Sequence, residues 1–339
     1  MAAYLPTDPL AAWLILTGWL GTLAAGFGIT RLHPAGPARC AAWLLVAASL
    51  ATALKICEEE PAGVRMVTVC ASLLLGMKAV VSVESQAAGQ PRLSALRWFA
   101  FAALWVGMRP ALFAKAGRAP LPGAGELIRR GLRRLVLGVV CLLVVQAVWP
   151  EPRSGLAGVG ALAGATALGL IGLSLSLHFG LFNMLAGLWR LAGMDCRPLF
   201  RAPLLARNLT EFWGRRWNLA FSEMTALAVA RPLAPCLGPG GAVIAAFLFS
   251  GVLHELAISV PVRAGYGGPL VYFALQGALV LVERGLGRAG WPIERLGWLG
   301  PVWTLGWLAL PLPILFHAPF LSGVVWPILG IRAGPAAGP

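Results

Sequence analysis

Long apolar stretches separated by short polar segments recur along the whole chain. Each stretch has roughly 17 to 22 residues, the length that an α-helix needs to cross about 30 Å of hydrocarbon. The pattern predicts spans at nine positions, which are 10–30, 40–57, 63–83, 95–113, 132–149, 156–177, 240–260, 267–283 and 297–316. A membrane β-barrel would need short segments of alternating polarity instead. We therefore expect an all-α, polytopic transmembrane protein with eight to ten spans.

Two further apolar segments do not predict a span on their own. Segment 178–194 follows directly on a full span, so it either extends that helix or lies along the membrane surface. Segment 320–330 is too short to cross the bilayer alone. We treat residues 1–332 as a single integral membrane domain and residues 333–339 as a disordered tail. The first apolar stretch has no basic segment before it, which indicates a membrane helix rather than a cleaved signal peptide.

Composition agrees with a membrane protein and argues against other classes. Of the 339 residues, 58% are hydrophobic and 12% are charged, whereas soluble proteins average about 25% charged residues. The net charge of +14 does not indicate nucleic-acid binding, because the basic residues lie in short loops between apolar stretches. The cysteines have neither CxxC nor metal-ligand spacing, so we predict no disulfide and no zinc site. They are Cys40, Cys57, Cys70, Cys141, Cys196 and Cys236.

Basic residues concentrate in two long loops, 109–134 and 190–218. Both should face the cytoplasm, and the two predicted spans between them agree with that. The loop that carries Arg31 and Arg39 is also basic, but three predicted spans lie between it and 109–134. Either one of those segments fails to cross, or the first loop breaks the tendency, and stretch 95–113 is the least secure span. Because Arg, Ala and Gly are abundant, we expect the inner (cytoplasmic) membrane of a bacterium.

The segment Asn208-Leu-Thr-Glu-Phe-Trp-Gly-Arg-Arg-Trp-Asn218 is the most distinctive string in the chain. Asn208 followed by Glu211 is typical of a helix start. At helical spacing one face carries Leu209, Phe212, Trp213 and Trp217, and the opposite face carries Glu211, Arg215 and Asn218. The segment is either a functional element or only an amphipathic anchor at the membrane interface, with Glu211 and Arg215 as a surface ion pair. Arg216 falls on the aromatic face, which favours a ligand or a carboxylate partner for it.

A second motif, Ser250-Gly-Val-Leu-His254-Glu255, lies inside an apolar span. Ionisable residues at membrane depth indicate function by default, and a histidine can take a proton from a hydroxyl. The alternative is a structural histidine bonded to a neighbouring helix. Ser250 and Gly251 lie one turn before His254, where small side chains leave room for a ligand or let another helix approach closely. Residue Ile258 excludes the HExxH zinc-protease motif.

The other ionisable residues within or beside the apolar stretches have ordinary explanations. His33 lies in a basic loop, and His178 and His317 lie at span ends. Residues 58–60 are three glutamates, which we interpret as a solvated loop on the non-cytoplasmic side. Lys78 and Glu84 lie near the end of the third span and either snorkel to the interface or line a cavity.

Together these strings resemble the wax synthase domain of the long-chain-alcohol O-fatty-acyltransferases, which are related to the membrane-bound O-acyltransferases. The resemblance rests on 179–193, Phe200, FWGRRWN at 212–218, and Ser-Gly-x-x-His-Glu at 250–255. It covers roughly residues 175–285, and Gly107-Met-Arg-Pro110 is similar to the family's middle region. The first hundred residues match only as hydrophobic spans. The resemblance implies a membrane-bound O-acyltransferase-like fold.

The resemblance also implies roles for residues of both motifs. His254 would be the general base that removes the alcohol proton, and Asn218 would orient a reactant or stabilise charge on the carbonyl oxygen. The acyl-CoA contacts would come from Trp213, Arg215, Arg216 and Trp217, with the arginines at the phosphates. The substrate pocket would include Ser250, Gly251 and Glu255, the last of which orients the imidazole or is structural. No metal or redox cofactor is implied.

The reaction implied is transfer of a fatty acyl group from acyl-CoA to a long-chain alcohol, which forms a wax ester. The partners would then be acyl-CoA, a hydrophobic alcohol and membrane lipids, and no nucleic acid. One alternative keeps the chemistry but changes the acceptor to a sterol, terpenoid or polyketide hydroxyl, or the donor to acetyl-CoA. Another is a lipid-binding protein or transporter without chemistry, for which inverted repeats or paired broken helices would be the signal. Neither is visible in the sequence.

Overall fold

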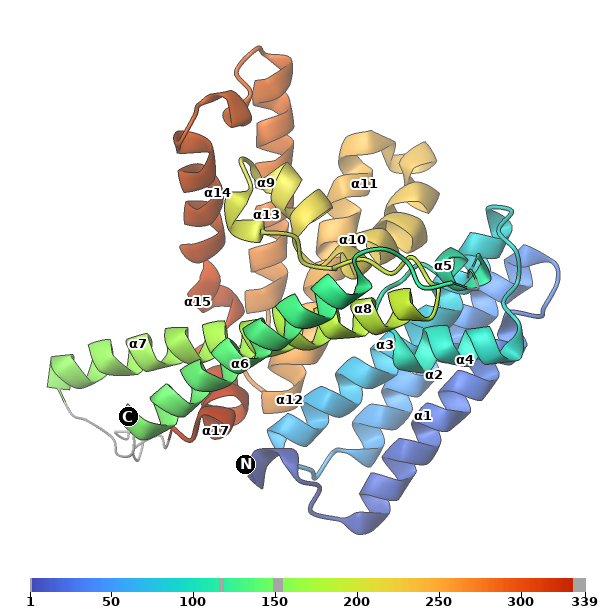
Figure 1. Cartoon of the computed structure of the whole chain (residues 1–339), viewed down its shortest axis with the longest axis horizontal. Helices are drawn as coiled ribbons and strands as arrows, with labels where there is room; N and C mark the ends of the chain where they lie inside the picture. The colour runs from blue at the N-terminus through green and yellow to red at the C-terminus, as the bar shows by residue number, and fades with distance from the viewer. Residues whose placement is uncertain (1, 116, 118, 149–154, 332–339) are drawn as a thin grey trace.

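A computed structural model describes residues 2–115, 117, 119–148 and 155–331, and the secondary structure in these ranges is helical without a strand (Figure 1). The predicted tail 333–339 lies outside the described residues. In these described ranges seven helical runs are long and apolar enough to cross a membrane, and a pair bent by 74° is a candidate for an eighth. The prediction of an all-α, polytopic membrane protein is therefore confirmed.

The runs that could cross correspond to eight of the nine predicted spans. They are Pro9–Ile29 (α1), Ala35–Ile56 (α2), Ala62–Ala87 (α3), Ala124–Val148 (α6), Gly158–Leu191 (α7 and α8), Leu219–Val262 (α10 to α12), Gly268–Arg288 (α13), and the bent pair Leu299–Leu315 with Ala318–Leu329 (α14 to α17). Within these runs the separate helices are α7 Gly155–Ser174, α8 Phe182–Leu191, α10 Leu219–Thr225, α11 Arg231–His254, α12 Val260–Val262, α14 Leu299–Ala309, α15 Leu312–Leu315, α16 Ala318–Phe320 and α17 Trp326–Leu329.

Two of these runs are longer than expected. Segment 178–194 extends the preceding span, because a π-helical turn at Leu175–Leu181 joins α7 to α8 without a break. The helical run that contains the span predicted at 240–260 begins much earlier, at Leu219. It bends at Gly238, which has φ 68° and ψ 173° and lies between Pro235 and Pro239. Prolines in a helix remove backbone hydrogen bonds, and the kink divides the run into two helical segments, of which the second begins where the span was predicted.

The span predicted at 95–113 is wrong. Only Ala95–Leu104 (α4) is helical at the start of this stretch; Trp105 is extended, and a short helix, Ala111–Ala114 (α5), follows. Ten residues of helix rise about 15 Å, which is half the thickness of the hydrocarbon core. The stretch therefore does not cross the bilayer.

Removing this span resolves the conflict between the basic loops. Arg92 donates a hydrogen bond to the carbonyl oxygen of Leu32 at 3.3 Å, which joins the loop before α2 to the loop before α4. Arg190 donates to the carbonyl oxygen of Pro122 at 2.8 Å, which joins the loop before α6 to the end of α8. Two spans now separate consecutive basic loops, and all of these loops lie on one side. That this side is the cytoplasm stays a prediction.

Lys78 explains why α4 stops where it does. Its side chain is fully buried, and the ammonium donates to the carbonyl oxygens of Phe101 (3.0 Å), Trp105 (2.6 Å) and Gly107 (2.7 Å). The last carbonyls of a helix have no partner within the helix, and a cation satisfies them well. Lys78 thus neither snorkels nor lines a cavity, and Glu84 forms an ion pair with Arg39 at 2.7 Å.

Candidate active site

The distinctive string 208–218 begins as a helix but does not continue as one. The Asn208 side chain accepts a hydrogen bond from the Glu211 N–H at 2.7 Å and starts the short helix Leu209–Glu211 (α9), which confirms the predicted helix start. A π-helical turn at Phe212–Arg216 follows, and Trp217 is extended. The predicted amphipathic helix therefore ends at Arg216, and Trp217 and Asn218 do not follow its periodicity.

Arg216 pairs with a carboxylate, one of the two kinds of partner expected from its position on the aromatic face. Its Nε donates to the Glu211 carboxylate at 2.7 Å, and its Nη1 donates to the carbonyl oxygen of Ala202 at 3.0 Å. Burial raises the pKa of Glu211, but the bonds from the Arg207 N–H and from Arg216 outweigh it and leave that pKa below its ordinary value. The predicted pair of Glu211 with Arg215 is wrong, because the π-helical turn places Arg216 there instead. Arg215 is exposed.

Two buried residues of α13 hold this segment, and neither was predicted from the sequence. Glu283 Oε1 accepts from the Leu209 N–H (2.7 Å) and from Trp303 Nε1 (3.0 Å). Glu283 Oε2 accepts from the Thr210 N–H (2.9 Å) and hydroxyl (3.0 Å). Figure 1 shows α9 beside α13 and α14, from which these partners come. The missed signal was an ionisable residue at the end of a predicted span.

Gln276 is the second of these residues. Its side chain is fully buried, accepts from Trp213 Nε1 at 3.2 Å and donates to the carbonyl oxygen of Trp307 at 2.8 Å. Gln276 and Glu283 are seven residues apart, so they lie on one face of α13. Phe273, three residues before Gln276, shares that face and packs against Trp213 with ring centroids 5.6 Å apart. One helix face therefore positions the aromatic string.

Replacing Glu283 with glutamine should loosen the start of α9. A glutamine keeps the size but has one oxygen instead of two, so its NH₂ group would face N–H or O–H donors. Leaving such buried donors unpaired costs about 1–3 kcal/mol each. We expect a lower melting temperature of the purified protein, measured in detergent. Glu294→Gln is the matched control, because Glu294 is exposed and needs only one oxygen to accept from Asn208 Nδ2. Equal melting temperatures of the two variants would contradict this role for Glu283.

His254 is the last residue of α11 and is partly exposed. Its Nδ1 bonds the carbonyl oxygen of Ser250, one turn earlier, at 2.7 Å. A carbonyl only accepts hydrogen bonds, so Nδ1 carries the proton and Nε2 carries the free lone pair. The ring lies between Phe273 and Phe221, with centroid distances of 4.1 Å and 5.5 Å. This tautomer presents a basic nitrogen among aromatic side chains.

Asn218 connects to His254 through Phe221. Asn218 has φ 42° and ψ 63°, a left-handed conformation that asparagine tolerates better than most residues, and it begins α10. Its Oδ1 accepts from the Phe221 N–H at 3.3 Å, and the Phe221 ring is the one that packs against His254. Because Oδ1 is used, the Nδ2 amide hydrogens are left to donate elsewhere. Phe221 thus contacts both predicted catalytic residues, Asn218 through its backbone N–H and His254 through its ring.

The residues beside His254 support the helix packing. A Cβ added to Gly251 would lie 2.9 Å from the Leu270 Cα, so the glycine lets α13 approach closely. Of the two alternatives for this small residue, room for a ligand or close helix packing, the structure supports helix packing. The Ser250 hydroxyl donates to the carbonyl oxygen of Ala246 at 2.9 Å. Glu255 Oε1 accepts from the Leu270 N–H at 3.1 Å near the start of α13, which is a structural contact.

His178 lies closer to the aromatic string than its place at a span end suggested. Its ring stacks on Phe200 at a centroid distance of 4.5 Å, and the Trp217 ring is 5.7 Å away. Phe200 also packs edge-on against Trp217 at 4.9 Å. The structure therefore brings together Phe200 and FWGRRWN, which the sequence separates, and places His178 beside them.

The middle segment also reaches this region. Arg109 forms an ion pair with Glu223 of α10 at 2.8 Å. Gly107, two residues earlier, is one of the carbonyl partners of Lys78. Gly107-Met-Arg-Pro110 therefore links the buried end of α4 to the helix that Asn218 begins.

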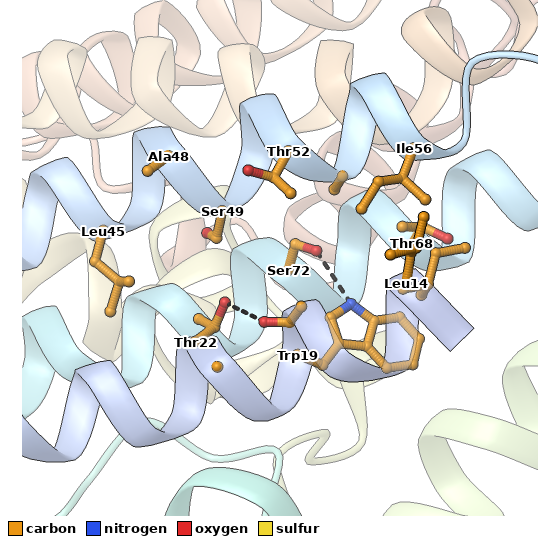
Figure 2. A pocket seen from close by; sticks show the side chains of 14 residues that line it. Leu14, Trp19, Thr22, Leu45, Ala48, Ser49, Thr52, Ile56, Thr68 and Ser72 are labelled. Carbon is orange, nitrogen blue, oxygen red and sulfur yellow. Dashed lines mark hydrogen bonds between the residues drawn. The ribbon is translucent and has the colours of Figure 1, made fainter. Parts of the chain in front are cut away.

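A cavity of about 280 Å³ lies between α1, α2 and α3 (Figure 2). Its polar lining consists of hydroxyls, such as those of Thr22 and Thr68, and the indole of Trp19, which donates to the Ser72 hydroxyl at 3.1 Å. No titratable side chain belongs to this lining, and neither Asn218 nor His254 does. The cavity is thus separate from the candidate active site, and we assign it no chemistry.

Comparison with known proteins identifies a protein family that matches the same region. Residues 196–275 match the membrane bound O-acyl transferase family. A probable long-chain-alcohol O-fatty-acyltransferase 6 of Arabidopsis thaliana is 34% identical over 139 residues, which are 36% of this chain and 40% of that protein. A long-chain-alcohol O-fatty-acyltransferase of Simmondsia chinensis is 34% identical over 106 residues, 29% of this chain and 30% of that protein.

A third relative has a different acceptor in its name. Acyl-CoA--sterol O-acyltransferase 1 of Arabidopsis thaliana is 38% identical over 73 residues, 20% of this chain and 21% of that protein. The chain thus spans less than half of the length of these curated relatives. Over residues 196–275, which contain both Asn218 and His254, it matches the membrane bound O-acyl transferase family, and the resemblance inferred from its motifs is confirmed.

Proposed function

We propose that this integral multi-pass membrane protein transfers a fatty acyl group from acyl-CoA to a long-chain alcohol and so forms a wax ester. The observation that carries the proposal is the tautomer of His254, whose Nδ1 is bonded to the Ser250 carbonyl so that Nε2 is free to act as a base. The similarity to long-chain-alcohol O-fatty-acyltransferases over the region that contains His254 supports the reaction type.

In the proposed reaction the alcohol oxygen attacks the thioester carbonyl carbon while its proton passes to His254 Nε2. The negative charge that develops on the carbonyl oxygen is stabilised by the Nδ2 hydrogens of Asn218, since the Asn218 Oδ1 is already used by Phe221. Collapse of the intermediate breaks the carbon–sulfur bond, and the coenzyme A thiolate takes the proton from the imidazolium. The rings of Phe221 and Phe273 cover part of the imidazole and limit the access of water to it.

We further propose that acyl-CoA approaches from the side of the basic loops. Arg215 is exposed and is our candidate for the phosphates. Arg216, which the resemblance also implicated, would act mainly by holding Glu211 and the Ala202 carbonyl. Trp213 and Trp217 would line the path of the acyl chain. The substrate pocket would lie beside Ser250, with Gly251 and Glu255 supporting α13.

A long-chain alcohol is the acceptor that we favour, and a sterol is the second candidate because of the match to a sterol acyltransferase. Membranes that contain the protein should form labelled ester from labelled acyl-CoA and a fatty alcohol. A panel with a sterol, a terpenoid alcohol and no acceptor, and with acetyl-CoA as a second donor, distinguishes the alternatives. Absence of ester with every combination of donor and acceptor would contradict the proposal and favour a lipid-binding protein or transporter. Location in the bacterial inner membrane remains part of this proposal and rests on composition; the named relatives are plant proteins.

A further inference from the structure

A second cavity, of about 680 Å³, lies at the end of the molecule opposite the basic loops. It opens where α2 ends at Ile56, where α3 begins at Ala62 and where α12 ends at Val262. Its lining consists of Ala51, Leu54, Lys55, Cys57, Glu58, Arg65, Val260, Arg263 and Tyr266. Its volume is within the range of small-molecule sites, and it shares no lining residue with the candidate active site.

Two guanidinium groups converge in this cavity on a single backbone oxygen. Arg65 Nη1 donates to the carbonyl oxygen of Glu58 at 3.2 Å, and Arg263 Nη2 donates to the same oxygen. Among the described residues no carboxylate lies within 4 Å of either guanidinium. The Glu58 carboxylate is used by Lys55, at 2.7 Å. The two like charges are therefore held together without a carboxylate in direct contact, although Glu59 lies near Arg65 and Glu58 lies near Arg263.

Arg65 also has an unused donor. Its Nε is buried and has no hydrogen-bond partner in the part of the chain that the structure describes. A buried unpaired donor costs about 1–3 kcal/mol, and more when it is charged. An acceptor that enters the cavity would remove this cost only if the Arg65 side chain shifts, because the Nε atom itself is not accessible. Arginine presents its donors as a planar fork that matches phosphate oxygens, so the acceptor that fits two neighbouring guanidiniums is a phosphate group.

The conformation of Arg263 agrees with a role for its side chain. It ends α12 with φ 55° and ψ 32°, the left-handed region. Glycine is the usual residue at such a helix end, and a residue with a Cβ is strained there. An arginine at this position is therefore unfavourable for the backbone, and its contribution has to come from the guanidinium.

The depth of the cavity indicates where the phosphate comes from. The helix ends that border it mark the membrane–water boundary, and Tyr266 at its rim is 62% exposed, as is typical of interfacial aromatic residues. The lining also contains apolar side chains, among them Leu54 and Val260. Charged and apolar side chains in one cavity at the end of membrane-spanning helices match a lipid whose phosphate lies at the interface and whose acyl chains run along the helices.

We propose that this cavity binds the phosphate headgroup of an anionic phospholipid in the leaflet opposite the basic loops, with Arg65 and Arg263 as the phosphate-binding residues. The bound lipid would join α3, which carries Arg65, to α12, which continues the helix of His254. Any ligand that binds only the folded state stabilises it. The lipid should therefore raise the melting temperature of the protein.

The test compares phosphatidylcholine nanodiscs with nanodiscs that also contain phosphatidylglycerol. We expect phosphatidylglycerol to raise the melting temperature of the full chain by about 3 °C or more, and native mass spectrometry to detect retained phosphatidylglycerol. Both effects should disappear in the double variant Arg65→Gln, Arg263→Gln. They should persist in Arg288→Gln, the control, since Arg288 is exposed at the far end of α13.

Three outcomes would overturn the proposal. One is an equal shift in the double glutamine variant and in the wild type. Another is the same shift from inorganic phosphate added to phosphatidylcholine nanodiscs, which would make the cavity a site for free phosphate rather than for a lipid. The third is loss of lipid retention in Arg288→Gln as well. If the glutamine variant does not fold, Arg65→Lys, Arg263→Lys takes its place: it keeps both charges but not the fork, and full retention of the lipid effect would exclude fork recognition.

Discussion

Replacing His254 with alanine should reduce ester formation from acyl-CoA and a long-chain alcohol by about 10²- to 10⁴-fold. The alanine removes the group whose free basic nitrogen the structure defines, since Nδ1 is fixed by the Ser250 carbonyl. Without that base the alcohol has to attack while it still carries its proton. The measurement is the initial rate of labelled ester formed by purified protein in detergent.

Folding of this variant has to be verified separately, because the imidazole also packs against Phe221 and Phe273. His254→Gln is the second variant, since it fills much of the same space without a basic nitrogen. His33→Ala is the matched control, because His33 lies in the exposed loop before α2. We expect the control to keep wild-type activity. Full activity of His254→Ala would show that the base is another residue.

Replacing Asn218 with aspartate should reduce the rate by about 10²- to 10³-fold, the usual effect of losing one donor to a developing oxyanion. Aspartate keeps the oxygen that accepts from the Phe221 N–H and so preserves the cap of α10. It also tolerates the left-handed conformation of this position. What it loses is the Nδ2 donor, and its negative charge repels the oxyanion. This substitution should therefore lower the activity without lowering the stability of the protein.

The expected melting temperature of Asn218→Asp is close to that of the wild type, and this distinguishes a chemical role from a structural one. Asn218→Ala is the companion variant, because it removes the cap as well as the donor. It should lose about 1 kcal/mol of stability in addition to activity. An Asn218→Asp protein that melts normally and keeps its rate would leave Asn218 as a helix cap only.

The spans could be predicted because they depend on a local property, the length of an apolar run. Stretch 95–113 shows the limit of that rule. It is apolar enough to cross, yet α4 ends after ten residues because Lys78, from another helix, takes the carbonyl oxygens of its last turn and of the following loop. No window along the sequence contains that contact. The basic loops signalled the error, since their charges are consistent with one side only after this span is removed.

The candidate site was predictable to a similar extent. Motif spacing and the family resemblance singled out Asn218 and His254 as candidates, and the Asn208 cap formed as expected because a cap needs only residues three apart. The partners of the aromatic string were not predictable, since Glu283 bonds to backbone groups more than 70 residues away. Arg216 rather than Arg215 pairs with Glu211 because a π-helical turn changes which residues meet.

By itself the sequence determined that this chain is a helical membrane protein, and it singled out the string and the histidine that we propose to carry its chemistry. Both conclusions follow from local features, namely apolar length and the spacing of residue types. Only the tertiary structure decided the tautomer of His254, the role of Gly251 in helix packing and the buried anchors Lys78 and Glu283. Each of these depends on which backbone groups remain without a partner after the helices pack, and that depends on all the helices together.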